Sequence, residues 1–377
     1  MVDIVLIGIG GFGNTYVNIL LSENAYNGKY NIKGLVDPYP DSCRKLDELK
    51  AMGIKLYNTV EEFYAENTAD LAIISSPIQF HTRQMKCALA NGSNVLCEKP
   101  LTGDDNDIDD LIAARDASGK FVSVGYQWSH NKAILDMKKD ILSGMYGAPV
   151  ELKTIVLWPR DKAYFNRGIG WAGKLADTDG TLIRDSVANN ATAHYLHNMY
   201  FVLGDAINTA LMPVKTEAVL YRVNPIQTFD TALIKSTFAN GATSLYIGTH
   251  TTNKSRDPEF IYKFEKGVIE YTDYKIVGTL NTGETIEYGN PFDNETESKL
   301  WPQLDNVING TQNIVCGIET ASVQVKVIAD THTYPIIDVP QDMISKMENK
   351  EILYIDGWFE KLCACYDNGS MDLDYKN

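Results

Sequence analysis

The sequence DIVLIGIGGFG, residues 3–13, decides the fold of the N-terminal part of this chain. An apolar strand runs directly into a Gly-x-Gly-x-x-Gly pattern, and residues 14–21 behind it are compatible with a helix. Gly8 permits a tight turn, Gly10 lets the backbone approach a pyrophosphate, and Gly13 lets the helix pack closely on the strand. The helix N-terminus adds free N–H groups and a positive dipole end. The stretch therefore predicts a dinucleotide-binding turn formed by Gly8, Gly10, Gly11, Phe12 and Gly13.

A second apolar strand, residues 31–37, ends in the carboxylate of Asp37 about 20 residues beyond the glycines. A carboxylate at this point accepts hydrogen bonds from both ribose hydroxyls and repels a 2′-phosphate. The next residues, Pro38 and Tyr39, offer no cation to offset that repulsion, and Arg44 is the first cation after them in the sequence. The pattern therefore predicts NAD rather than NADP as the cofactor. The alternative is that Asp37 only caps the turn that follows it.

The composition is that of an ordinary soluble globular protein. The 377 residues are enough for two domains, and they are 44% hydrophobic and 22% charged. Because a formal net charge of -15 repels a phosphate backbone, we expect no nucleic-acid binding. The sequence has no apolar run of membrane-spanning length and begins with a core strand, so we expect no membrane association and a cytoplasmic location. The six cysteines are scattered, which predicts reduced thiols and no metal site.

Residues 1–127 alternate strand and helix, a pattern that predicts a Rossmann domain with a doubly wound parallel sheet. Its strands are expected at residues 3–8, 31–37, 70–75, 94–98 and 121–125. Residues 128–377 show long alternating strands with hairpin turns, which predict an α/β domain with a mainly antiparallel sheet. The turns are expected at residues 240–241, 266–267 and 281–283, and the helices at residues 132–143, 297–308, 319–330 and 351–366.

Polar residues follow two strands of the expected parallel sheet, at Ser76 and Pro77 and at Glu98 and Lys99. Ligands of such sheets bind at the carboxyl ends of the strands, so we expect Ser76, Pro77 and Glu98 beside the cofactor. A lysine at the position of Lys99 can donate to a substrate oxygen and stabilise the negative charge that develops there. The alternative is a surface lysine in a proline turn. His81 either lines the cofactor site or orders the loop, and the second role is favoured.

A further group of polar residues lies in DSVANNATAHYLHN, residues 185–198. The C-terminal part of this stretch predicts a helix, which would place Asn190, His194 and His197 on one face. A histidine there can accept a hydroxyl proton while hydride passes to the cofactor. A buried structural histidine is the alternative, and a metal site at His194 and His197 lacks an obvious third ligand.

A long stretch without a strand or helix pattern, residues 158–185, separates these elements and is rich in Tyr, Trp, Arg, Gly and Asp. Loops of this length in a compact domain are usually functional or disordered. The residues expected to form a lid over a substrate pocket are Arg160, Tyr164, Arg167 and Trp171, and Trp158 is expected to bind the substrate with them.

Taken together, these motifs resemble the Gfo/Idh/MocA oxidoreductases. The resemblance is carried by Gly8 to Gly13, by Pro77-x-x-x-His81, by Glu98-Lys99-Pro100 and by the stretch from Asn309 to Ala321. It implies a Rossmann domain followed by an α/β domain with a large, open, mostly antiparallel sheet. In the family, the face of this sheet often mediates contacts in a homodimer or homotetramer, so a homo-oligomer is expected.

The resemblance also implies a sugar, a sugar derivative or a cyclitol as the substrate, with Lys99 and His194 as the catalytic pair. The family's Asp-x-Gly-x-His-x-x-Asp is similar to Asn190-x-Thr192-x-His194-x-x-His197, so Asn190 replaces a carboxylate. The expected activity is NAD-dependent oxidation of a secondary hydroxyl, in which Lys99 orients the oxygen, His194 acts as general acid or base and Asn190 positions a hydroxyl. The alternatives are an NAD-dependent glycoside hydrolase that acts by oxidation and elimination, and a catalytically silent regulator that binds NAD and sugar.

Overall fold

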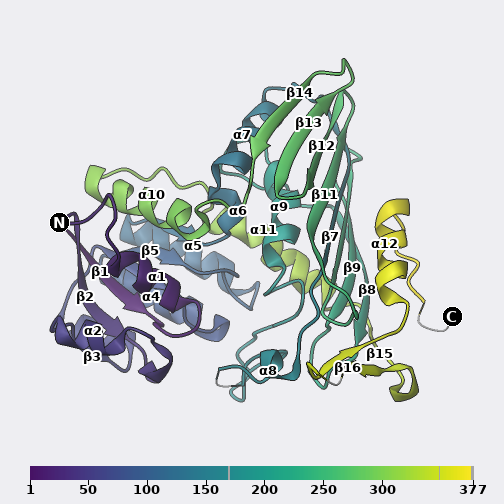
Figure 1. Ribbon diagram of the computed structural model, residues 1–377. Helices are drawn as coiled ribbons and strands as arrows, with labels where there is room; N and C mark the ends of the chain where they lie inside the picture. Colours follow the sequence, from purple (N-terminus) through teal and green to yellow (C-terminus); the bar gives the residue numbers. More distant parts are fainter. Residues whose placement is uncertain (169, 348, 375–377) are drawn as a thin grey trace. The chain divides into compact units, whose positions relative to one another are not determined.

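The computed structural model describes residues 1–168, 170–347 and 349–374, which form two compact units (Figure 1). The first unit comprises Met1–Asn131 and Asn294–Ser322, and the second comprises Lys132–Asp293 and Val323–Asn377. The expected boundary lies after residue 127. The structure differs from the expected division mainly in the segment Asn294–Ser322, which returns to the first unit.

The first unit contains a six-stranded parallel sheet in the order β3-β2-β1-β4-β5-β6. Its strands are β1 Val2–Ile7, β2 Tyr30–Val36, β3 Leu56–Tyr57, β4 Leu71–Ile74, β5 Asn94–Cys97 and β6 Val122–Val124. The strand order reverses between β1 and β4, so the ligand crevice of a doubly wound sheet lies at the carboxyl ends of these two strands. The predicted Rossmann sheet is confirmed, except that its two-residue strand β3 was not expected.

Helices bury the sheet of the first unit, so that Ile4, Val5, Leu6 and Ile7 of β1 are no more than 2% exposed. The helices are α1 Gly13–Leu21, α2 Leu46–Ala51, α3 Val60–Glu66, α4 His81–Ala90, α5 Asp107–Ser118, α6 Gln127–His130 and α10 Glu295–Asn309, with 3₁₀ turns η1 Pro40–Ser42 and η2 Ile78–Phe80. Helix α10 packs on α1, α6, β1 and β5. Its apolar face joins the core of this sheet, which explains why the segment belongs to the first unit.

The second unit contains a nine-stranded sheet in the order β14-β13-β12-β11-β7-β10-β9-β8-β15. Its strands are β7 Pro149–Leu157, β8 Lys215–Arg222, β9 Thr231–Thr237, β10 Thr243–Thr249, β11 Arg256–Phe264, β12 Gly267–Thr272, β13 Lys275–Leu280, β14 Thr285–Gly289 and β15 Ile336–Asp338. The pairs β7–β10 and β8–β15 are parallel, and the other pairs are antiparallel. The mostly antiparallel sheet is therefore confirmed, and its hairpin turns lie where the sequence predicts them.

The remaining helices and a small hairpin complete the second unit. They are α7 Lys132–Leu142, α8 Lys162–Phe165, α9 Ala193–Val202, α12 Trp358–Asn368, the 3₁₀ turn η3 Gln341–Met343 and the hairpin of β16 Ser345–Met347 and β17 Ile352–Tyr354. Helix α11, Ile318–Thr331, begins in the first unit and ends in the second. Helices α9 and α12 both contact β7 and β10, and Figure 1 shows them on opposite sides of the sheet.

Two predicted helices begin later than expected. The helix expected over residues 351–366 is preceded by β17, and α12 begins only after Gly357, whose φ of 77° stops the extended backbone. Helix α9 begins at Ala193, so Asn190 lies in the preceding turn and not on the helix. The hydroxyl of Thr192 donates to the carbonyl of Val187, and this local bond competes with helix formation.

None of the helices in the described ranges is both long and apolar enough to span a bilayer.

Candidate active site

The glycine turn after β1 has the shape that its sequence predicts. At Gly8, φ is 81° and a Cβ atom would lie 2.6 Å from the backbone nitrogen of Ser76 at the end of β4. At Gly13, a Cβ atom would lie 2.1 Å from the carbonyl oxygen of Gly8. Side chains are thus excluded at both positions because β1, β4 and α1 approach so closely.

The start of α1 fits a pyrophosphate. Phe12 is the N-cap residue and makes no side-chain hydrogen bond to the helix, and the first turn contains no acidic residue. The N–H groups of Gly13 and Thr15 donate to the carbonyl oxygens of Gly10 and Phe12, at 2.7 and 2.9 Å. The helix dipole favours an anion at the other N–H groups of this turn. At Gly11, a Cβ atom would meet no other atom within 4 Å, so the turn is open on this side.

Asp37, directly after β2, is held against the glycine turn. Its Oδ2 atom accepts a hydrogen bond of 3.0 Å from the backbone N–H of Ile9, and its Oδ1 atom accepts one of 2.8 Å from Tyr39. The carboxylate is half-buried and retains lone pairs for further donors. Both sequence interpretations of Asp37 have a counterpart in the structure, because the bond to Tyr39 caps the turn while the bond to Ile9 fixes the carboxylate where a ribose would lie.

Glu98, directly after β5, is the centre of a buried polar group. The residue is 6% exposed. Its Oε1 atom accepts a hydrogen bond of 2.7 Å from the Tyr16 hydroxyl and a second one from the Lys299 ammonium, and its Oε2 atom accepts one of 3.3 Å from the backbone N–H of Lys99. Burial, reinforced by the charge of Glu98, raises the pKa of Tyr16 well above its usual value, so Tyr16 remains the donor. The carboxylate thus fixes the backbone from which the Lys99 side chain extends.

Lys299 on α10 was missed by the sequence analysis. Its side chain is fully buried, and the ammonium also donates to the carbonyl of Gly125 at 3.4 Å and lies 4.6 Å from the centre of the Phe12 ring. One cation therefore connects the glycine turn, β5 and α10. The sequence around Lys299 could not predict this contact, because Glu98 lies 201 residues earlier in the chain.

His81, at the start of α4, connects the ends of β4 and β5. It is 1% exposed, and its Nδ1 and Nε2 atoms lie 2.9 Å from the carbonyl oxygens of Pro100 and Ser76, respectively. Burial lowers the pKa of this imidazole. The peptide between Lys99 and Pro100 is cis. The two strand ends that carry Ser76, Pro77 and Lys99 are thus held together by His81, and these contacts support an ordering role for this histidine.

In the second unit, the structure places a carboxylate behind Asn190 that the sequence analysis did not identify. The Asn190 Nδ2 atom donates to Asp185 Oδ1 at 2.7 Å, and Asp185 Oδ2 accepts from the backbone N–H of Gly173 at 2.5 Å. Asp185 is only 4% exposed. Because this bond uses the amide nitrogen, it turns the acceptor Oδ1 of Asn190 away from the carboxylate. The family pattern has a carboxylate at position 190. In this chain, the carboxylate belongs to Asp185, which is hydrogen-bonded to Asn190.

The two histidines of α9 have different surroundings. His194 is 9% exposed, whereas His197 is 1% exposed and stacks on Phe201 with ring centres 5.9 Å apart. Tyr195, next to His194, packs edge to face against Trp158 at 5.7 Å. These contacts place Trp158 near the start of α9 and His197 in the core. Within the described ranges, no group of three or more His, Cys, Asp or Glu side chains is placed to bind a metal ion.

Trp158 and the four residues expected to form a lid lie together, and these five residues are called the arginine cluster here. Tyr164 on α8 has the Arg160 guanidinium 4.9 Å from its ring centre and the Arg167 guanidinium 3.7 Å from it. Arg160 also lies 5.4 Å from Trp158, and Arg167 lies 4.6 Å from Trp171. The alternation of rings and guanidinium groups is a set of cation–π contacts. The sequence identified these residues but not this stacked order.

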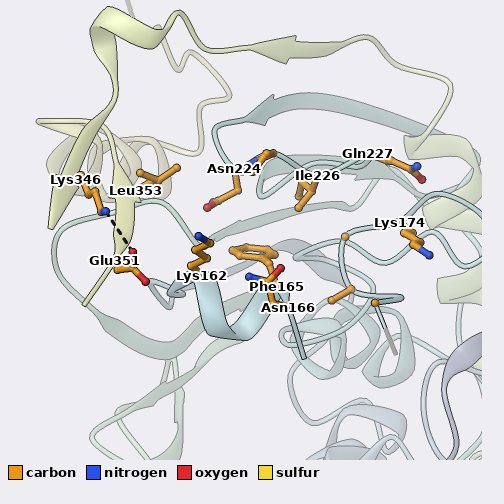
Figure 2. A pocket seen from close by; sticks show the side chains of 14 residues that line it. Lys162, Phe165, Asn166, Lys174, Asn224, Ile226, Gln227, Lys346, Glu351 and Leu353 are labelled. Carbon is orange, nitrogen blue, oxygen red and sulfur yellow. Dashed lines mark hydrogen bonds and ion pairs between the residues drawn. The ribbon is translucent and has the colours of Figure 1, made fainter. Parts of the chain in front are cut away.

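A cavity of about 520 Å³ lies beside α8 and was not expected from the sequence (Figure 2). Lys162 on α8, Lys174 and Lys346 of β16 line it, and Lys346 forms an ion pair of 3.4 Å with Glu351. The turn after β8 contributes Asn224 and its neighbours. The cavity therefore has more positive than negative side chains around it.

The sequence of the first unit matches a known family. Residues 2–126 match the model of the Gfo/Idh/MocA family, described as an oxidoreductase family with an NAD-binding Rossmann fold. The resemblance expected from the motifs is therefore confirmed for this part of the chain. The expected NAD-binding domain is thereby confirmed.

Curated relatives match a similar part of the chain. The inositol 2-dehydrogenase/D-chiro-inositol 3-dehydrogenase of Shouchella clausii is 26% identical over 151 residues, which are 40% of this chain and 43% of the relative. The 1,5-anhydro-D-fructose reductase of Ensifer adhaerens is 25% identical over 154 residues, again 40% of this chain and 43% of the relative. The matched part of the chain thus spans less than half the length of these relatives.

Solved structures resemble nearly the whole chain in fold. The WlbA dehydrogenase from Bordetella pertussis, in complex with NADH and UDP-GlcNAcA, superposes with a TM-score of 0.70 at 18% identity, covering 88% of this chain and 95% of that one. The aldose-aldose oxidoreductase from Caulobacter crescentus, complexed with glycerol, gives a TM-score of 0.68 at 16% identity, covering 88% and 96%. The likeness confirms the expected fold of both units.

Proposed function

We propose that this protein is an NAD-dependent dehydrogenase that acts on a secondary hydroxyl of a sugar, a sugar derivative or a cyclitol. The observation that carries the proposal is the position of Lys99, directly after β5 in the same sheet as the glycine turn, with its backbone fixed by Glu98. The names of the relatives and structural neighbours support this class of substrate, since they are inositol, anhydrofructose and aldose oxidoreductases and a dehydrogenase in complex with NADH and UDP-GlcNAcA.

The residues of the first unit fit a bound dinucleotide. The open first turn of α1 would hold the pyrophosphate, and Asp37 would accept hydrogen bonds from the ribose. Bound NAD supplies the hydride acceptor or donor for the reaction. Comparative titration with NADH and NADPH tests this assignment, and NADH should bind much more tightly because Asp37 repels a 2′-phosphate. Equal binding would contradict the role of Asp37.

Three side chains are proposed to act on the substrate. The Lys99 ammonium donates to the oxygen of the reacting carbon and stabilises its negative charge. An imidazole nitrogen of His194 accepts the hydroxyl proton during oxidation and returns it during reduction. Asn190 accepts a hydrogen bond from a neighbouring hydroxyl through Oδ1, and Asp185 holds the amide in the orientation this requires.

The decisive experiment is a panel of sugars and cyclitols in which the absorbance of NADH is followed. Formation of NADH with one member of the panel, lost in Lys99→Ala and His194→Ala, supports the proposal. Release of a sugar from a glycoside without net NADH identifies a hydrolase instead. Tight binding of NADH without turnover of any member identifies a regulator. A homodimer or homotetramer that uses the face of the nine-stranded sheet belongs to the same proposal, and sedimentation velocity tests it.

A further inference from the structure

Within the described residues, the two guanidinium groups of the arginine cluster lack an ion pair with a carboxylate, unlike four other arginines of the chain. Arg83, Arg115, Arg222 and Arg256 each form an ion pair with a carboxylate. Across residues 1–168, 170–347 and 349–374, neither Arg160 nor Arg167 forms one, although the chain has 49 acidic and 34 basic residues. Two cations that share one tyrosine ring repel each other, so an anion bound between or beside them would stabilise this arrangement.

The hydrogen bonds of the two guanidinium groups leave donors for such an anion. Arg167 uses Nη1 to donate to the carbonyl oxygen of Tyr164 at 2.6 Å. The Nε atom of Arg160 is buried and has no acceptor among the described residues. A guanidinium has five N–H donors in a planar fork, which matches the paired oxygens of a carboxylate or a phosphate.

The contacts of the cluster lead to the proposed catalytic residues of the same unit. Trp158, which lies under Arg160, packs on Tyr195, the neighbour of His194 on α9. Tyr164 of the cluster also lines a small cavity together with Asp185, the residue that accepts the hydrogen bond from Asn190. These contacts connect the arginine cluster, through Trp158 and Asp185, with the segments that carry His194 and Asn190.

We propose that the arginine cluster binds an anionic group, a carboxylate or a phosphate, of a carbohydrate substrate. The inference rests on the proposed function, because it assigns a charge to the substrate of that dehydrogenase. Arg160 and Arg167 donate to the anionic group, and the rings of Trp158, Tyr164 and Trp171 hold the two guanidinium groups in place. The neutral part of the sugar then extends toward His194 and Asn190.

The test compares matched neutral and anionic probes by isothermal titration calorimetry on the NADH-saturated protein. The sets are D-glucose with D-glucuronate and D-glucose 6-phosphate, D-galactose with D-galacturonate and D-galactose 6-phosphate, and myo-inositol with myo-inositol 1-phosphate. In at least one set, the anionic member should bind about tenfold more tightly or better, as expected for a charge-assisted hydrogen bond. The favoured anion distinguishes a carboxylate from a phosphate. No preference in any set would overturn the proposal.

Variants distinguish binding by the arginine cluster from attraction by other positive side chains. Arg160→Gln and Arg167→Gln should each weaken binding of the anionic probe about tenfold while leaving the neutral probe unchanged. Lys162→Gln is the matched control. It removes an exposed cation of α8, the helix that carries Tyr164, and this cation is not one of the two stacked guanidinium groups. The variant should therefore keep the preference for the anionic probe. Arg167→Lys keeps the charge but loses the planar fork, so only part of the preference should remain. A full preference in both glutamine variants would contradict the proposal.

The same measurements distinguish failure of this inference from failure of the proposed function. If no probe is oxidised but Arg167→Gln still abolishes tight binding of an anionic probe, the cluster binds anions and the dehydrogenase proposal is wrong. If a neutral sugar is oxidised as efficiently as its anionic partner, the dehydrogenase stands and the cluster has no such role. The affinity for NADH should be unchanged in both glutamine variants, since a loss would assign the anion to the cofactor instead.

Discussion

The first unit pairs a buried lysine with a carboxylate, whereas the second unit stacks two arginines on aromatic rings. In the first unit, Lys299 is fully buried and is neutralised by Glu98, with the Tyr16 hydroxyl on the same carboxylate oxygen. In the second unit, Arg160 and Arg167 are half-buried and lie against aromatic rings, without an ion pair in the described part of the chain.

This difference separates two uses of a positive charge. A buried lysine needs partners that replace its lost hydration, and a carboxylate is the strongest of these, so the pair of Lys299 with Glu98 has a structural role. An arginine stacked on a ring keeps most of its hydrogen-bond donors, so it remains able to bind a ligand. Substitutions at the paired cation should therefore change stability, whereas substitutions at the stacked cations should change affinity.

The largest effect is expected from breaking the buried pair. Lys299→Met leaves Glu98 without its cation and should lower the free energy of unfolding by about 3–5 kcal/mol. Lys299→Met combined with Glu98→Gln should recover part of this loss, because no charge is then left unpaired. Urea unfolding measures both variants. The exposed control Lys162→Met should change stability by less than about 0.5 kcal/mol. A loss that small in Lys299→Met would show that the pair is not structural.

The second effect concerns Lys99, the cation proposed to act on the substrate. Lys99→Ala should lower kcat by about 10²- to 10³-fold, because it removes a donor that matters mainly when charge develops on the substrate oxygen. The affinity for NADH should stay nearly unchanged, since the substitution keeps the backbone N–H of Lys99 that donates to Glu98. Steady-state kinetics and NADH titration measure the two quantities separately. Loss of NADH binding, or full turnover, would contradict the proposed role.

A smaller effect is expected where Asp185 lies behind Asn190. A carboxylate stabilises a nearby imidazolium, so Asp185→Asn should move the acid limb of the oxidation rate profile to lower pH, by up to about 1 unit. Asn190→Asp should move the acid limb to higher pH. The shift should be smaller than that caused by a fully ionised carboxylate, because two carboxyl groups at the 2.7 Å separation of residues 185 and 190 share a proton.

Rate profiles from pH 5 to pH 9 for both variants check this prediction. His194→Ala should abolish the acid limb and most of the turnover. An unchanged profile in Asp185→Asn, together with normal turnover in His194→Ala, would remove His194 from the mechanism. The regulator would then be the better interpretation.

The smallest effect concerns the buried histidines. Burial lowers the pKa of His130 and His332 to about 4 and that of His250 to about 3. The unfolded chain, with a histidine pKa of about 6.5, therefore binds more protons, so stability falls as the pH drops below about 6.5. Each histidine should contribute about 0.5–1 kcal/mol of this loss between pH 7 and pH 6.

Thermal unfolding at pH 7, 6 and 5 measures this loss. Asp230 acts in the opposite sense, since burial raises its pKa to about 6 and the folded state then holds the extra proton, but the three histidines together outweigh this one group. His332→Gln, which replaces the least buried of the three histidines, should flatten the dependence on pH. A melting temperature that stays constant from pH 7 to pH 5 would be inconsistent with neutral buried histidines.

The sequence predicted those elements whose pattern is local. The glycine turn, the strands of the parallel sheet and the hairpins of the second sheet follow from alternation and turn residues within about ten positions. Strand β3 has only two residues and carries no pattern of its own. Asn190 was placed on the helix because its spacing from His194 fits one, but Thr192 and its neighbours bond to the backbone instead.

The parts of the candidate site that sequence reasoning missed depend on contacts between distant segments. Lys299 contacts Glu98 across 201 residues, and nothing around Lys299 marks it as the partner of a carboxylate. Asp185 stood within the stretch selected from the sequence, but its bond to Asn190 depends on a turn that spacing alone does not define. The arginine cluster was found by composition, whereas its stacked order required the structure.

The return of α10 to the first unit has a consequence for synthesis on the ribosome. Lys299 emerges 201 residues after Glu98, which corresponds to about 10–40 s at ordinary rates of translation. During this interval, the growing chain holds the glycine turn, β5 and a carboxylate whose cation has not yet been made. The nucleotide-binding unit therefore completes its fold only after nearly all of the second unit's large sheet has left the exit tunnel, and a nascent chain that stalls before α10 would be a substrate for chaperones.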